Sequence, residues 1–98
     1  MISVAVLFFA TLRDRAGISR LDVELPEGSL VSDLKSLLSD RFPDLAPLMS
    51  STLVAVNHEY ADGMEALSTG DEVAFFPPVS ALAFSYAATA SLKRLDTR

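Results

Sequence analysis

The chain has 98 residues, which is the length of one small domain with a single hydrophobic core. Half of the residues are hydrophobic and the mean hydropathy is +0.34, a composition that indicates a folded domain and excludes a largely disordered chain. The absence of cysteine excludes disulfides, thiolate metal sites and a cysteine nucleophile, and a single histidine, His58, argues against a zinc site.

The charge is divided unevenly along the chain. Residues 1–78 carry five basic and twelve acidic side chains, a net charge of −7, whereas residues 79–98 carry three basic side chains and one acidic side chain, a net charge of +2. A body this acidic argues against nucleic acid as a partner and favours a basic protein surface. Because no apolar run could span a membrane and the N-terminus lacks a signal-peptide pattern, we expect a cytoplasmic protein.

The first part of the chain predicts two strands joined by a loop. Residues 2–9 are rich in β-branched and aromatic side chains on both alternating faces, as in a strand that is covered on both sides. Residues 13–20 are polar around Gly17, which predicts a loop or a hairpin turn. Residues 21–25 alternate between apolar and acidic side chains, which predicts a half-exposed strand.

A helix is predicted over residues 31–42, because apolar side chains recur there at helical spacing and polar ones occupy the opposite face. Ser29 is the expected N-cap, and Pro43 is expected to end the helix. Residues 44–51 predict a short connector whose apolar side chains cover one end of the core.

Two more strands are predicted after the connector. Residues 53–57 predict the third strand, with a turn at Asp62-Gly63, and residues 72–76 predict the last strand, which Pro77 and Pro78 end. The first and last strands are the most apolar, so we expect them to be parallel neighbours in a mixed sheet with the helix across one face. The predicted fold class is therefore α+β.

Two motifs carry a resemblance to a known family. Leu-Phe-Phe-Ala occupies residues 7–10, and the more specific run Gly-Asp-Glu-Val-Ala-Phe-Phe-Pro-Pro-Val occupies residues 70–79. Shorter pieces, Pro-Glu-Gly, Asp-Leu and Val-Asn, lie between them in the right order and spacing. This pattern resembles the small subunits of molybdopterin synthase (MoaD), a family of ubiquitin-like sulfur carriers with the β-grasp fold. The resemblance covers residues 1–80 as one β-grasp domain and leaves residues 81–98 as an atypical extension.

The resemblance implies a carrier that is not itself an enzyme and that holds no cofactor or metal. Members of the family end in Gly-Gly, and an ATP-dependent adenylating enzyme of the ubiquitin-activating (E1-like) type activates the terminal carboxylate, which becomes a thiocarboxylate. The tail then enters the large subunit of molybdopterin synthase and delivers sulfur in molybdenum cofactor biosynthesis. Glycine suits such a tail because it has no Cβ and lets the backbone approach closely.

The chain departs from this pattern at the Gly-Gly positions, where it has Ala81 and Leu82, and no glycine occurs after Gly70. One explanation is a changed reading frame near the 3′ end of the gene, natural or introduced in cloning. A second is a precursor trimmed by a protease, although trimming cannot create Gly-Gly. A third is a β-grasp interaction or regulatory module without transfer chemistry. A sulfur carrier of the thiamine pathway (ThiS) is a further alternative, against which the Phe-Phe-Pro-Pro-Val ending argues.

One face of the sheet is predicted to bind the partner. Consecutive strand residues point to opposite faces, so if Phe8 and Phe75 lie under the helix, Phe9 and Phe76 lie on the other face. Tyr60 is expected to border that face, and the same positions match those that contact the large subunit in the family. The predicted partner-binding residues are Phe9, Tyr60, Phe76, Pro77, Pro78, Val79 and Ser80.

Less specific interpretations stay open beside this one. The connector or the C-terminal tail could cover the same apolar face, and the two prolines could simply end the last strand. Residues 82–92 fit a strand pattern and a helical stripe equally well, and addition or exchange of this tail is one route to a homo-oligomer. His58 is expected to be an exposed turn residue.

Overall fold

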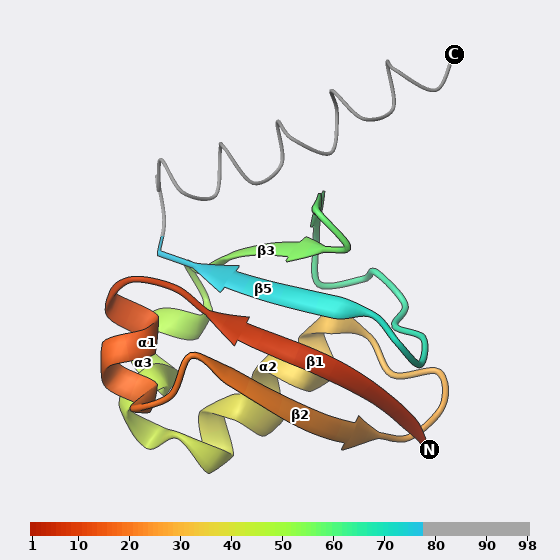
Figure 1. Cartoon of the computed structure of the whole chain (residues 1–98), viewed down its shortest axis with the longest axis horizontal. Helices are drawn as coiled ribbons and strands as arrows, with labels where there is room; N and C mark the ends of the chain where they lie inside the picture. The colour runs from red at the N-terminus through yellow and green to blue at the C-terminus, as the bar shows by residue number, and fades with distance from the viewer. Residues whose placement is uncertain (78–98) are drawn as a thin grey trace.

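Within residues 1–77, which the computed structural model describes, five strands form one mixed sheet with helices packed on one of its faces (Figure 1). The strand order across the sheet is β2-β1-β5-β3-β4. The elements in chain order are β1 (Ile2–Phe8), α1 (Thr11–Ala16), β2 (Arg20–Leu25), α2 (Val31–Arg41), the 3-10 turn η1 (Pro43–Leu45), α3 (Ala46–Met49), β3 (Leu53–Val56), β4 (Glu59–Ala61) and β5 (Glu72–Phe76).

The predicted parallel pairing of the first and last strands is confirmed. β1 and β5 run parallel in the middle of the sheet, with Val6 opposite Val73 and Phe8 opposite Phe75. β2 adds antiparallel to β1, and β3 adds antiparallel to β5. Apolar side chains on both faces are typical of the central strands of a sheet, and these two strands take the central positions.

The main core lies between the sheet and α2. The apolar stripe of α2 places Val31, Leu34 and Leu38 against the sheet without exposed surface. Phe8 meets Phe42 edge to face, with ring centroids 5.9 Å apart, and Phe75 at 6.1 Å. Each such side chain contributes about 1.5–3 kcal/mol by leaving water, so this layer supplies most of the stability.

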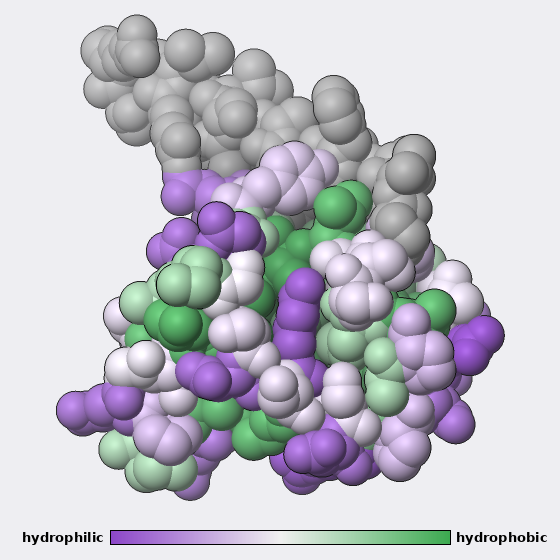
Figure 2. All heavy atoms as spheres, turned by 180° about the vertical axis from the view of Figure 1, so that it is seen from behind, coloured by the Kyte–Doolittle hydropathy of each residue, from purple (hydrophilic) through white to green (hydrophobic). Residues whose placement is uncertain are grey.

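The outer surface of the helical layer is mixed. Figure 2 shows hydrophilic side chains interspersed with near-neutral and hydrophobic ones across this side of the molecule. The connector covers one end of the core as predicted, because Leu45 and Met49 of η1 and α3 are buried. Leu67 is buried as well, in the loop before β5.

The expected loop over residues 13–20 is wrong for residues 13–16, which belong to α1, whereas residues 17–19 form the turn into β2. Leu12, 1% exposed, anchors this short helix to the core, with Ala16 one turn later on the same side. Gly17, at φ 78°, ends the helix in the left-handed conformation, and its N–H donates to the carbonyl of Arg13 (2.9 Å). The glycine that suggested a turn is thus a helix C-cap.

The expected N-cap of α2 is also wrong. Leu30 occupies the N-cap position, and its N–H donates to the Asp33 carboxylate at 2.8 Å. Ser29 lies one residue earlier and donates its hydroxyl to the carbonyl of Pro26 at 2.6 Å, which fixes the turn before the helix. Asp33 therefore performs the capping from inside the first turn, where its charge also suits the helix dipole.

The sequence patterns missed β4, which pairs antiparallel with β3. The two strands are joined by a two-residue turn in which Asn57 and His58 both have positive φ, 51° and 71°. This geometry matches the right-handed twist of a hairpin, and asparagine adopts it more readily than most residues. The strand it introduces carries Tyr60 at the edge of the sheet.

Candidate functional site

The sheet face opposite the helices carries a second, smaller apolar cluster. Ala55, Ala74 and Phe76 form its centre, and half-buried Leu7, Phe9 and Leu53 pack around them. This separation follows the parity expected from the sequence, because Phe8 and Phe75 belong to the helix-side core and Phe9 and Phe76 do not.

An aromatic stack joins the centre of this second cluster to its surroundings. The rings of Phe9 and Phe76 lie 4.5 Å apart and 11° from parallel. Phe76 has no exposed surface, whereas Phe9 is half-buried. Phe9, Leu7 and Leu53 therefore supply the partly exposed apolar surface of this face.

Phe9 is held by a strained turn between β1 and α1. Its N–H donates to the carbonyl of Phe75 (3.2 Å), and its carbonyl accepts from the N–H of Leu12 (3.1 Å). Ala10, which directly follows Phe9, has φ 53° and ψ −128°, a conformation that glycine adopts easily and alanine does not. Such a residue costs on the order of 1–3 kcal/mol, so the surrounding contacts must hold it there.

Tyr60 lies on the same face as the second cluster. It pairs with Ala55 across β3 and β4, and residues directly opposite in an antiparallel pair project to the same side. Its side chain is 51% exposed, at the sheet edge. The placement agrees with the expectation that Tyr60 borders this face.

The remaining predicted site residues continue from the end of β5. Because β1 and β5 are parallel, β5 ends at the same edge of the sheet at which β1 leads into α1 (Figure 1). Pro77 comes directly after β5 and is half-buried. Pro78, Val79 and Ser80 lie outside the described residues, as do Ala81 and Leu82 and the whole of the proposed extension 81–98.

At the opposite end of β5, a polar network not predicted from the sequence fixes the β3–β4 turn. The Asn57 amide donates to the Asp71 carboxylate at 2.9 Å and accepts from the N–H of Glu72 at 3.0 Å. The other carboxylate oxygen of Asp71 accepts from the N–H of Ser68 at 2.8 Å. An asparagine directly after a strand, with an aspartate just before another strand, was the available signal for this contact.

His58 completes that turn and faces Glu72, with 3.8 Å between its Nε2 and a carboxylate oxygen. Its side chain is 41% exposed, in keeping with the expected turn position. Among residues 1–77, no group of three histidine, aspartate or glutamate side chains converges as metal ligands do.

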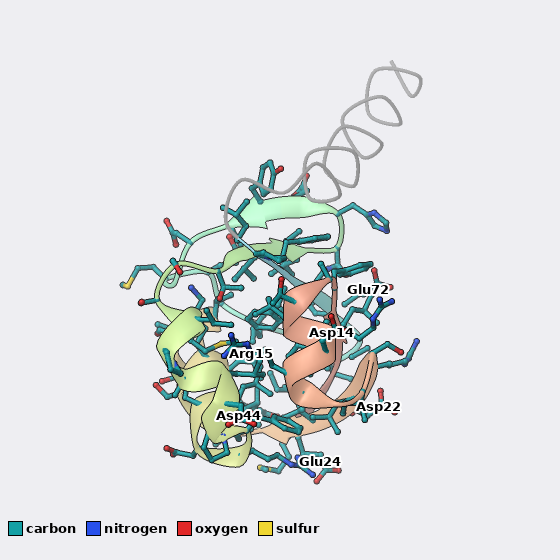
Figure 3. All side chains as sticks on the ribbon, turned by 90° about the vertical axis from the view of Figure 1, so that its left-hand side faces the viewer. Asp14, Arg15, Asp22, Glu24, Asp44 and Glu72 are labelled. Carbon is teal, nitrogen blue, oxygen red and sulfur yellow. The ribbon has the colours of Figure 1, made fainter. Side chains whose placement is uncertain are left out.

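Acidic side chains project from several elements around the body. Figure 3 shows five of them, from α1, β2, η1 and β5, namely Asp14, Asp22, Glu24, Asp44 and Glu72. Arg15 lies between α1 and α3 in the same view. In the part of the chain that the structure describes, no helix is long and apolar enough to cross a membrane.

Sequence comparison identifies relatives over this same region. The model of the ThiS family matches residues 6–80. A molybdopterin synthase sulfur carrier subunit from Chlamydomonas reinhardtii is 38% identical over 79 residues, which cover 79% of this chain and 95% of the relative. Its counterpart from Mycobacterium tuberculosis is 36% identical over 81 residues, which cover 82% of this chain and 98% of the relative.

Structural comparison agrees with the predicted β-grasp fold. The small archaeal modifier protein 1 of Haloferax volcanii superposes with a TM-score of 0.74 and 29% sequence identity, and the alignment covers 81% of this chain and all of that protein. The mixed sheet, the central parallel pair and the helix across one face are common to this ubiquitin-like fold. The family match and the curated relatives cover most of the chain, and the chain therefore belongs to the ThiS family of β-grasp proteins.

Proposed function

We propose that this chain is a sulfur-carrier small subunit of molybdopterin synthase. It takes up sulfur as a C-terminal thiocarboxylate and delivers it in molybdenum cofactor biosynthesis, without catalysing the transfer itself. Its partners are the large synthase subunit and an ATP-dependent adenylating enzyme, and it works in the cytoplasm. The observation that carries the proposal is the match to relatives named as sulfur carrier subunits, which spans 95% of the length of the Chlamydomonas relative.

The second apolar cluster supports a docking role for the β-grasp body. A five-stranded sheet needs apolar side chains on one face to hold its helices, and here apolar side chains gather on the other face as well. Phe9, Leu7 and Leu53 offer the partner a rigid apolar surface, backed by buried Phe76. Tyr60 adds an aromatic side chain with a polar hydroxyl at the rim, a residue type enriched at protein interfaces.

The β-grasp body serves the reaction by holding the end of β5 next to the docked partner. β5 lies beside the docking face and ends at Phe76, so a partner seated on this face lies next to the point from which the chain continues. Proline fixes its own φ, so Pro77 restricts the backbone at the point where the chain leaves β5. In this proposal residues 1–80 are the carrier domain and residues 81–98 are an added segment.

The transfer chemistry depends on the two residues after Ser80. The family resemblance calls for Gly-Gly there, and this chain has Ala81 and Leu82, whose side chains would not fit a channel that admits only bare backbone. That observation favours a second candidate function, an interaction or regulatory module that binds the synthase without carrying sulfur. The two candidates share the docking face and differ only in whether a thiocarboxylate forms.

Intact-mass measurement separates the two candidates. The full chain is incubated with ATP, a sulfur source and the adenylating enzyme from the same organism, beside a matched variant that ends Ser80-Gly-Gly. Replacement of one carboxylate oxygen by sulfur in both proteins supports the carrier as the chain stands. Sulfur in the Gly-Gly variant alone indicates that this chain docks without carrying sulfur. It also indicates that the β-grasp domain can act as a carrier once the Gly-Gly end is restored. Sulfur in neither, together with no binding of the large subunit to either, contradicts the proposed function.

A further inference from the structure

The sheet face opposite the helices, here called the second face, changes character along its strands. Where β5 ends it carries the second apolar cluster, to which Leu7 belongs. Ala5, two residues earlier in β1, shares the face of Leu7 and lies opposite both Asp22 and Glu72. Glu24 is two residues from Asp22 in β2 and projects to the same side. These three carboxylates form an acidic end of the second face, and Asp22 and Glu72 are seen in Figure 3 on the side of the body away from α2.

The charge at the acidic end is only weakly compensated by its own neighbours. Arg20 approaches Asp22 to 3.7 Å, and both side chains are more than half exposed, so this pair contributes little. Glu72 faces His58 at 3.8 Å, across a side chain that is 37% exposed. The second face therefore offers apolar surface at one end and carboxylates at the other. A segment that complements the whole face is apolar first and basic afterwards.

The C-terminal segment of this chain, residues 81–98, has that order. Its large apolar side chains before the first basic residue are Leu82, Phe84, Tyr86 and Leu92, and its basic side chains are Lys93, Arg94 and Arg98. With Asp96 as the one acidic side chain, the segment has a net charge of +2, opposite in sign to the charge of −7 on residues 1–78. The apolar part follows β5 after only a few residues, and β5 ends beside the apolar part of the second face.

The length of the segment matches the length of the face. From Phe76 back to Glu72 the strand takes four steps of about 3.3 Å, a distance of about 13 Å. Residues 82–92 span about 16 Å at the rise of a helix and about 36 Å at the rise of a strand. In either conformation they are long enough to carry Lys93 from the apolar end to the acidic end. Residues 78–81 supply the four residues that a reversal of chain direction needs.

We propose that residues 81–98 dock on the second face of their own sheet, with the apolar side chains on the second apolar cluster and Lys93 and Arg94 at the acidic end. Attachment to β5 gives the segment an effective concentration on the order of millimolar, which an unattached partner must overcome. The docking itself does not depend on the proposed function. Its consequence does rest on that function, because the segment then covers the surface at which the large subunit docks and lowers the apparent affinity for that subunit.

A spin label tests the docking on the full chain. Because the chain has no cysteine, Ser91→Cys provides a single attachment point for a nitroxide. The label is expected to weaken the methyl NMR signals of Ala5 and Leu7, on the second face, more than those of Leu34 and Leu37 in α2. Equal weakening on both sides of the sheet, or none, overturns the proposal. A mixture of isotope-labelled native chain with unlabelled spin-labelled chain tests for a second copy, and weakening in that mixture also overturns docking within one chain.

Variants of the segment test whether its apolar side chains hold it in place. Phe84→Ser/Leu92→Ser removes two large apolar side chains and is expected to abolish the difference in signal weakening between the two sides of the sheet. The control Ala83→Ser/Ala90→Ser introduces two serines in the same segment but removes little apolar surface, and is expected to keep the difference. Equal effects of the two double variants contradict apolar docking.

Variants of the body test the charge complementarity. Asp22→Asn/Glu24→Gln removes two carboxylates from the acidic end and is expected to reduce the signal weakening at low salt, with a smaller effect at high salt. The control Asp40→Asn/Asp44→Asn makes the same change in net charge in α2 and η1, on the helical side, and is expected to leave the signals unchanged. The same loss in both proteins would show that net charge alone, and not the acidic end, attracts the segment.

The affinity for the large synthase subunit tests the consequence of docking. Phe84→Ser/Leu92→Ser is expected to bind that subunit about tenfold more tightly than the native chain, which corresponds to a face covered for about nine-tenths of the time. Equal affinity of the two proteins overturns competition by the segment. If the spin label shows docking and the large subunit binds neither protein, the docking stands and the proposed function fails.

Discussion

Replacing two adjacent phenylalanines one at a time separates folding from docking in this protein. Phe8 is 2% exposed and contacts the rings of Phe42 and Phe75, so Phe8→Ala is expected to cost about 3–5 kcal/mol of unfolding free energy. A domain of this size has roughly 5–15 kcal/mol in total. Phe9 is half-buried and stacks on Phe76, so Phe9→Ala is expected to cost about 1–2 kcal/mol.

The two substitutions are expected to affect binding in the opposite order to stability. Phe9→Ala removes an aromatic side chain from the proposed docking face and is expected to weaken binding to the large synthase subunit about tenfold or more, as substitution of an aromatic residue that anchors an interface does elsewhere. Phe8→Ala leaves that face in place, and the fraction that remains folded is expected to bind normally.

Urea unfolding followed by circular dichroism measures the stabilities, and calorimetric titration measures the affinities. If Phe9→Ala destabilised the fold as much as Phe8→Ala and left the affinity unchanged, the second apolar cluster would be core and the docking argument would be refuted.

Further substitutions test the backbone features that support these surfaces. Ala10→Gly is expected to raise the unfolding free energy by about 1 kcal/mol, because glycine tolerates the positive φ. The control Ala46→Gly, at a helical and exposed position, is expected to lower the unfolding free energy by about the same amount. A lower unfolding free energy in both variants would refute strain at Ala10. Gly17→Ala is expected to cost about 1 kcal/mol from conformation alone, since an added Cβ has no neighbour within 4 Å, and an unchanged thermal midpoint would contradict this. Asn57→Ala removes the contacts with Asp71 and the adjacent backbone and leaves alanine at positive φ, so about 2 kcal/mol is expected to be lost in urea unfolding; a loss below half of that would show that the network adds little.

The strand parity around the phenylalanine pairs was predictable because a β-strand alternates strictly. Once β1 and β5 are identified as parallel neighbours, assigning Phe75 to the helix side also fixes the sides of Phe8, Phe9 and Phe76. The burial of Phe76 was not predictable in the same way. Alternation specifies a face, whereas exposure depends on every segment that packs over that face.

The elements that were missed are short ones. α1 has six residues and β4 has three, too few for a periodic pattern to stand out. α1 depends on one buried leucine, Leu12, and on the left-handed cap at Gly17, while β4 depends on the hydrogen bonds of Asn57 to residues 14 and 15 positions later. Contacts of that kind are tertiary, and sequence patterns report mainly on local periodicity.

The proposed docking face depends on the strained turn at Ala10. Phe9, on the apolar face, lies immediately before this residue, and α1, which carries Arg13, lies immediately after it. The bonds of Phe9 to Phe75 and Leu12, together with the burial of Leu12, hold Ala10 in a conformation that its Cβ disfavours. Relaxation of this turn would change the orientation of α1 relative to β1, and with it the position of Phe9 on the apolar face. In the proposed docking, the partner must find Phe9 in a fixed position, and the strain at Ala10 is then a cost that the fold bears where rigidity serves binding.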